Sequence, residues 1–120
     1  KKINKEIRKM LGELGINDEE INKLELKLNG YRYVDELPDI NYGCYIRWIS
    51  LKEKNMDNIK LTNGGILCDI NILKNGIHLK CKNRFNKFFQ IKLDENLVFQ
   101  KLKDTELIIL KVLDFLEKNK

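Results

Sequence analysis

The spacing of apolar residues changes twice along the chain. Over residues 3–14 they recur every three or four positions, which predicts an amphipathic helix ending at Gly15. Over residues 64–93 apolar and polar residues mostly alternate, which is the period of strands whose two faces differ. The helical period returns after Asp104, which we expect to cap a last helix reaching about Glu117. These periods predict an α+β chain, helical at both ends and β-rich between them.

The segment from Asn17 to Val34 fits two structures. Asn17 precedes three acidic residues, a favourable helix start because asparagine caps and acids suit the first turn. The buried stripe of that helix would be Ile21, Leu24 and Leu28. Alternation over residues 24–28, followed by Asn29-Gly30, would instead make a hairpin. We favour the helix, because the start at Asn17 would otherwise begin only a turn or two, and we interpret Tyr31–Asn41 as an irregular connector.

The Asn75-Gly76 dipeptide lies between two alternating runs and predicts a β-hairpin with a type I′ turn. This turn places Lys74 opposite Ile77 and Ile70 opposite Cys81. The register predicts an inward face of Ile66, Cys68, Ile70, Ile72, Ile77, Leu79 and Cys81. It predicts an outward face of Leu67, Asp69, Asn71, Leu73, His78, Lys80 and Lys82.

Further strands are predicted over Gly43–Leu51, Ile59–Leu61, Lys87–Leu93 and Leu97–Lys101. Five or six short strands joined by tight turns indicate a small antiparallel SH3-like or OB-like barrel, with the helices covering its edges or one mouth. We expect residues 1–41 to form an N-terminal helical segment and connector. Residues 42–120 would form the barrel with its C-terminal helix, all within one compact domain.

The last helix is unusually apolar and again leaves two interpretations. At 100° per residue, one broad face holds Ile108, Ile109, Val112, Phe115 and Leu116. Leu107 and Leu110 fall instead among charged residues. Either the helix is sandwiched between the barrel and the N-terminal helices, or part of it meets another copy of the chain, with Leu107 and Leu110 as self-association candidates. We favour the sandwich.

Charge is concentrated in the second half of the chain. The formal net charge is +5, and five basic residues with no acid lie between Lys80 and Lys92. The candidate nucleic-acid-binding residues on this face and its adjoining turn are Lys80, Lys82, Arg84, Phe85, Lys87, Phe88, Gln90 and Lys92. Cations neutralise phosphates and exposed rings stack on bases without sequence preference. The alternative is a solvated basic face whose rings pack under a helix.

Other chemistries have weaker support. An aromatic cage for methylated cations could be built from Tyr31, Tyr33, Tyr42, Tyr45 and Trp48, although we favour core and rim packing as the role of these rings. Cys44, Cys68, His78 and Cys81 lack the paired spacing of zinc sites. His78 has no neighbouring nucleophile or orienting acid. We expect no enzyme activity, no metal, no cofactor and no small-molecule substrate.

The sequence has no apolar run of 18 residues and no signal peptide, so we expect no membrane association. Its three cysteines, an odd number, suit reduced thiols and an intracellular protein.

Four short motifs, Gly43–Ile49, Thr62–Leu67, Ile77–Asn83 and Phe88–Gln90, together resemble small barrel proteins of uncertain function encoded by large DNA viruses of protists. The similarity spans roughly residues 43–101. It implies an SH3-like barrel in a viral setting (host cytoplasm, nucleus or virion) and a role near the viral genome, transcription or virion. No catalytic residues come with it. The leading hypothesis is a non-catalytic nucleic-acid-binding module of low sequence selectivity. The alternative is a protein-interaction or scaffold module that self-associates through the C-terminal helix.

Overall fold

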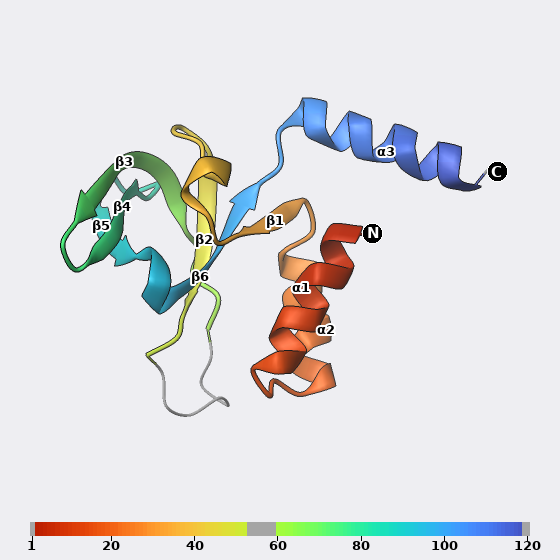
Figure 1. Cartoon of the computed structure of the whole chain (residues 1–120), viewed down its shortest axis with the longest axis horizontal. Helices are drawn as coiled ribbons and strands as arrows, with labels where there is room; N and C mark the ends of the chain where they lie inside the picture. Colours follow the sequence, from red (N-terminus) through yellow and green to blue (C-terminus); the bar gives the residue numbers. More distant parts are fainter. Residues whose placement is uncertain (1, 53–59, 119–120) are drawn as a thin grey trace.

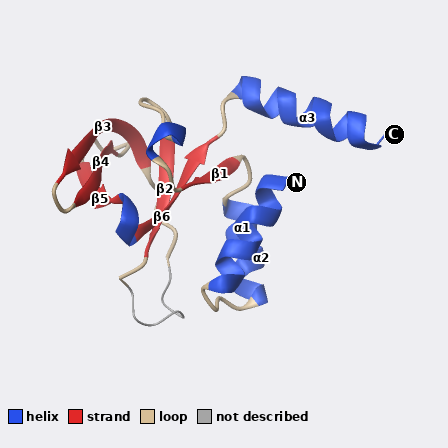
Figure 2. Ribbon diagram, in the orientation of Figure 1, coloured by secondary structure: helices blue, strands red, loops and turns tan. Residues whose placement is uncertain are grey.

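The computed structural model describes residues 2–52 and 60–118, and it is an α+β fold with a six-stranded antiparallel sheet (Figures 1 and 2). Its helices are α1 (Lys2–Glu13), α2 (Asp18–Lys27) and α3 (Asp104–Lys118), with short 3-10 turns at Leu37–Asp39 and Leu93–Glu95. Its strands are β1 (Tyr31–Val34), β2 (Tyr45–Ser50), β3 (Gly65–Leu73), β4 (Gly76–Lys82), β5 (Phe88–Lys92) and β6 (Asn96–Lys101).

The sheet is open, so the predicted α+β class is confirmed but the SH3-like or OB-like barrel is not. The strand order is β1-β6-β2-β3-β4-β5, which leaves β1 and β5 as edges that do not pair with each other within the described chain. β2 and β3 share only two residue pairs, Tyr45↔Ile66 and Ile46↔Gly65. This short junction joins the β1-β6-β2 half to a curled β3-β4-β5 half (Figure 2). The curl is strong, but the edges do not meet.

The two N-terminal helices form an antiparallel pair on one face of the β1-β6-β2 half. The Asn17 side chain accepts a hydrogen bond from the Glu20 backbone N–H at 2.9 Å, so the helix interpretation of this segment is confirmed. The first core cluster joins both helices to β2 and β6 through Ile7, Leu11, Ile16, Ile21, Leu24, Leu28, Ile49, Leu97 and Phe99. Periodicity alone located these helix faces correctly.

The connector predicted over Tyr31–Asn41 is partly wrong, because Tyr31–Val34 forms the edge strand β1. It pairs with β6, and Tyr33 lies opposite Phe99. The buried Gln100 side chain accepts from the Asn41 N–H at 2.9 Å and donates to the Asp39 carbonyl at 3.4 Å. The rest of the connector is therefore fastened to β6. Partners that lie 59 and 61 positions away leave no local sequence signal.

A second core cluster fills the opposite face of β2 and β6 and the concave side of the curled half. It consists of Val34, Ile40, Ile46, Trp48, Leu67, Leu79, Cys81 and Val98. β2 and β6 therefore contribute to both clusters, with Ile49, Leu97 and Phe99 in the first and Ile46, Trp48 and Val98 in the second.

The hairpin between β3 and β4 forms, but its register differs from the prediction by two positions. Leu73 pairs with Gly76, and Ile70 pairs with Leu79, so the two loop residues are Lys74 and Asn75. Gly76 adopts a φ of +128°, a value that L side chains disfavour. Because a shift of two keeps every residue on its own face, Ile70, Ile77 and Leu79 face the core as predicted. Ile72, which was also predicted to face inward, is 70% exposed.

A β-bulge at Cys68 reverses the predicted faces at the start of β3. The register is Leu67↔Cys81 on one side of the bulge and Asp69↔Lys80 on the other. Leu67 is therefore buried, while Ile66 and Cys68 are exposed, the opposite of the predicted arrangement. Only Cys81 of the two cysteines predicted to face the core lies there.

Two smaller predictions have mixed outcomes. Ile59 of the predicted strand 59–61 lies outside the described residues, and Leu61 forms an isolated bridge with Ile49. The predicted sandwich around α3 is wrong, because no residue of Asp104–Lys118 is buried. Figure 1 shows α3 leaving the sheet after β6, with the C-terminus at its far end.

Candidate functional site

The predicted basic face divides into separate groups, the first of which lies on the outer side of β4 and β5. Lys82 is paired with Phe88, and Lys80 with Gln90. The Lys80 ammonium nitrogen lies 4.8 Å from the centroid of the Phe88 ring, and that of Lys82 lies 5.8 Å from it. The ring is thus bracketed by two cations and attracts them through its π face.

Lys92 is separated from this group by an acidic partner. Its ammonium lies 3.6 Å from the Glu95 carboxylate, which also pairs with Lys52 at 3.0 Å. The hydrogen bond from Lys52, with the nearby charge of Lys92, lowers the pKa of Glu95. A charge already neutralised in this way contributes less to binding a phosphate.

The turn between β4 and β5 presents Arg84 and Phe85. The Asn83 side-chain oxygen accepts from the backbone N–H groups of Phe85 at 2.9 Å and Lys87 at 3.0 Å. Asn86 completes the turn in a left-handed conformation with φ of +63°. The Arg84 guanidinium lies 4.8 Å from the Phe85 ring centroid, and that ring is 67% exposed. The turn is therefore ordered by its own hydrogen bonds while both side chains face solvent.

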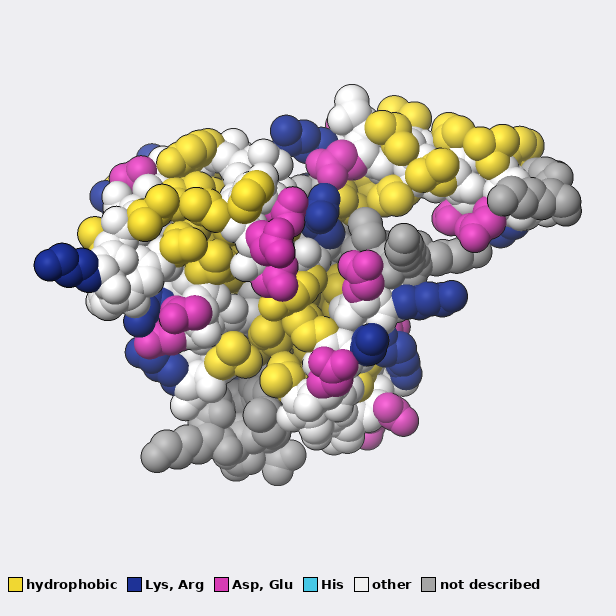
Figure 3. Space-filling model, in the orientation of Figure 1, with side chains coloured by type: hydrophobic (Ala, Val, Ile, Leu, Met, Phe, Trp, Pro, Cys, Tyr) yellow, Lys and Arg dark blue, Asp and Glu magenta, His cyan; other side chains and the backbone are white. Residues whose placement is uncertain are grey.

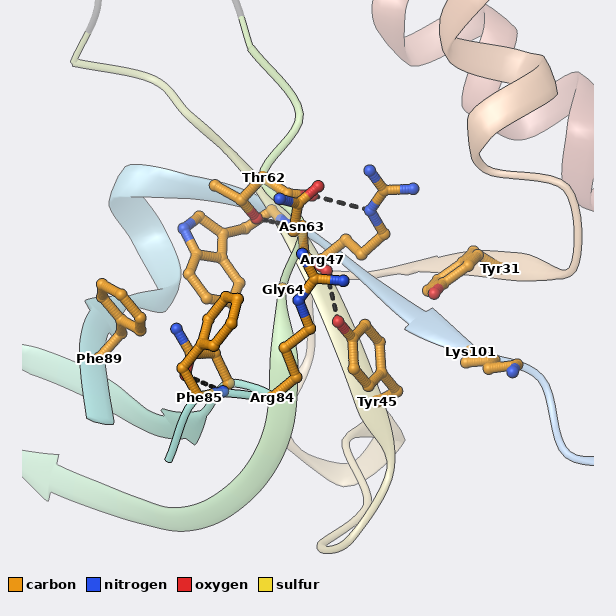
Figure 4. A pocket seen from close by; sticks show the side chains of 12 residues that line it. Tyr31, Tyr45, Arg47, Thr62, Asn63, Gly64, Arg84, Phe85, Phe89 and Lys101 are labelled. Carbon is orange, nitrogen blue, oxygen red and sulfur yellow. Dashed lines mark hydrogen bonds between the residues drawn. The ribbon is translucent and has the colours of Figure 1, made fainter. Parts of the chain in front are cut away.

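A hollow of about 760 Å³ lies beside this turn, and we call it the basic groove (Figure 4). It is lined by Tyr31, Tyr45, Arg47, Trp48, Thr62, Asn63, Gly64, Asn83, Arg84, Phe85, Phe89 and Lys101. It brings Arg84 and Phe85 of the predicted basic face together with Tyr31, Tyr45 and Trp48 of the predicted cage. Figure 4 shows Phe89 and Phe85 at one end, Tyr31 and Lys101 at the other, and Arg84 and Tyr45 between them.

The floor of the basic groove is the segment 62–64, which is fixed by side chains of β2. Tyr45 donates its hydroxyl to the Asn63 carbonyl at 2.6 Å, and Arg47 Nε donates to the Thr62 carbonyl at 2.7 Å. A second Arg47 nitrogen donates to the Lys27 carbonyl at 3.2 Å, which ties the groove to α2. The rings and cations therefore stand on a backbone that is already organised.

Glycine at position 64 is a steric requirement of this floor. Its φ is +81°, and a Cβ atom placed there would lie 2.0 Å from the Ile46 carbonyl oxygen. Segment 62–64 crosses β2 so closely that a larger residue would displace it.

The groove is electropositive. Its described lining contains three cations, Arg47, Arg84 and Lys101, and no aspartate or glutamate. Burial raises the pKa of the Tyr31 phenol, against the lowering effect of Arg47, so this hydroxyl stays protonated at neutral pH. Such a lining suits an anionic ligand that also carries flat rings, and its cations disfavour a methylated ammonium group.

The remaining candidates lie elsewhere. Tyr33 packs against Phe99 with ring centroids 5.8 Å apart, and the exposed Tyr42 does not line the groove. The His78 ring nitrogens lie 3.0 Å from the side chains of Asn75 and Gln90. Among the residues that the structure describes, no group of three or more histidines, cysteines and acids could hold a metal ion.

Sequence reasoning missed Arg47, Lys101, Phe89 and the 62–64 floor as parts of one site. Arg47 and Lys101 belong to different strands, and their approach depends on the order of strands in the sheet. The glycine pair Gly64-Gly65 is the one signal in the sequence of a close backbone approach.

Comparison with protein-family models, curated proteins and solved structures found no match for this chain. The resemblance to viral barrel proteins therefore stays a prediction. No described helix combines the length and the apolar character needed to cross a bilayer.

Proposed function

We propose that this protein binds single-stranded nucleic acid in the basic groove, with little sequence selectivity and without catalysing a reaction. The observation that carries the proposal is that five aromatic rings and three cations line one hollow whose described lining has no acid. Single-strand binding proteins combine these two features, since cations follow the phosphates and rings stack on bases of any sequence.

The shape of the site favours a single strand over a duplex. Phe85 and Phe89 line a concave surface rather than a flat one, and Phe89 also packs against Trp48 with ring centroids 6.5 Å apart. Bases within a duplex are already stacked on one another, whereas those of a single strand are free to enter a hollow and stack on Phe85. A DNA duplex would contact only the cations at the edge of the groove and would not reach its rings.

The chemistry of the lining supports binding rather than catalysis. The described groove residues with polar side chains are arginine, lysine, tyrosine, tryptophan, threonine and asparagine. A general base at neutral pH is most often histidine or a carboxylate, and neither is among the described residues that line the hollow. The lysines of the outer face, Lys80 and Lys82, would extend the path of the strand beyond Arg84.

The test is the affinity for a fluorescent oligothymidylate of about 12 nucleotides, a length within the usual range for one small binding module. Arg84→Glu with Lys101→Glu should weaken binding at least a hundredfold, because two attractive charges become repulsive. Phe85→Ala should cost about 1–3 kcal/mol of binding free energy through lost stacking.

The matched control is Lys5→Glu with Lys74→Glu, which makes the same charge change at exposed positions outside the groove. It should weaken binding much less than the groove pair does. Equal losses in both pairs would mean that net charge rather than the groove governs binding. An unchanged affinity in the groove pair would show that the site is misassigned.

A further inference from the structure

Helix α3 displays a broad apolar surface that belongs to neither core cluster of the described chain. Its exposed apolar side chains are Ile108, Ile109, Val112, Leu113, Phe115 and Leu116, each more than half exposed. In α1, by contrast, Ile7 and Leu11 are 1% and 0% exposed. Figure 3 shows apolar side chains along the visible length of α3.

The exposed residues occupy one side of the helix. At 100° per residue they span an arc of about 160°, much wider than one row of contacts requires. Leu107 and Leu110 fall outside this arc and are half-buried, and Glu106 pairs with Arg32 at 4.0 Å. A helix of 15 residues is only marginally stable in water unless its apolar face is packed. Packing of Ile108, Ile109, Val112, Leu113 and Leu116 against a partner would therefore stabilise α3.

Charge narrows the choice of partner. α3 carries four acids and two lysines, a net of −2, whereas the whole chain is +5, so the remainder carries +7. An anionic bilayer or a nucleic acid would be repelled by this helix, because helices that lie on membranes carry lysine and arginine on their polar face. A second copy of α3 carries lysines as well as acids, so its flanks can pair with those of the first.

We infer that the apolar arc of α3 is a homodimer interface, in which the α3 helices of two copies pack side by side. The exposed side chains offer about 600 Å² per copy, so two copies would bury about 1,200 Å², the lower end of the range for stable interfaces. This inference does not depend on the function of the basic groove.

The flanks of the arc favour a parallel pair. Lys111 and Lys118 lie on one flank and Glu117 on the other. Parallel helices bring opposite flanks together, so Lys111 and Lys118 meet Glu117, whereas antiparallel helices would place Lys111 of one copy beside Lys111 of the other. The dimer is expected to form with a micromolar dissociation constant, of the order typical of small interfaces.

The test is sedimentation equilibrium of the full chain at about 2–200 μM, the range that brackets the expected constant. The wild type should pass from monomer to dimer, whereas Ile109→Glu with Leu116→Glu should stay monomeric. The matched control is Leu26→Glu on α2, which places the same charge at a side chain that is 80% exposed and should leave the dimer intact.

A second variant keeps the test decisive should the glutamate pair fail to fold. Ile109→Ala with Leu116→Ala retains strong helix formers and should weaken the dimer at least tenfold. A wild type that is monomeric at every concentration would overturn the inference, as would an alanine pair or a folded glutamate pair that dimerises as the wild type does.

Discussion

The basic groove and the apolar arc of α3 are two exposed surfaces of the described chain, and they are built in opposite ways. In the groove, Tyr45 and Arg47 are fixed by hydrogen bonds to segment 62–64. The arc consists of aliphatic and aromatic side chains on a helix with no buried residue. A surface with fixed polar groups can select a ligand by geometry, whereas an apolar one depends on the area that it buries.

The difference also separates the partners. The described lining of the groove has cations without acids, and α3 is acidic overall, so an anionic ligand is attracted to the first and repelled by the second. The two surfaces should therefore respond independently to mutation. A substitution confined to one of them tests whether the other is unaffected.

The largest effect is expected from Gly64→Ala, which removes the floor of the groove and leaves α3 untouched. The added methyl group would lie 2.0 Å from the Ile46 carbonyl oxygen at a left-handed backbone position. We expect a loss of about 2–4 kcal/mol in the free energy of unfolding, measured by urea denaturation, together with a loss of oligonucleotide binding.

Gly12→Ala is its control. A Cβ atom at this position of α1 would have nothing within 4 Å, and alanine is the better helix former. Stability should stay equal or rise by up to about 1 kcal/mol. If both alanine variants behaved alike, the close crossing of segment 62–64 over β2 would be wrong.

Periodicity and capping located the helices because both depend on neighbours in sequence. The Asn17 cap and the buried positions Ile7 and Leu11 follow from spacing alone. The faces of β3 could not be predicted for the residues that precede Asp69, because one bulged residue reverses every side chain before it. The open sheet likewise depends on the short junction between β2 and β3, which leaves no local pattern.

The candidate site was half predictable for a related reason. Arg84 and Phe85 are adjacent in a basic stretch and were recognised together. Their approach to Tyr45 and Lys101 needs the strand order, since these residues lie on three different parts of the sheet. Composition indicated a surface of basic and aromatic residues, and the tertiary structure determines which of those residues line the groove.

A smaller effect is expected in the reactivity of two cysteines, which tests the bulge near the start of β3. Cys68 is exposed, whereas burial raises the pKa of the Cys81 thiol to about 12. At pH 8 iodoacetamide should therefore modify Cys68 in the folded protein and reach Cys81 only after unfolding, because the thiolate is the reactive form. Mass spectrometry of peptides would measure both modification rates. Equal protection of the two thiols would contradict the bulge and support the register without it.

The most direct test of the central claim is the salt dependence of oligothymidylate binding by the wild-type protein. If Arg47, Arg84 and Lys101 each neutralise one phosphate of a single strand, the logarithm of the association constant should fall with the logarithm of salt concentration with a slope of about −2. Contacts from Lys80 and Lys82 would steepen it. Binding that does not change with salt, or no binding at low salt, would contradict the account.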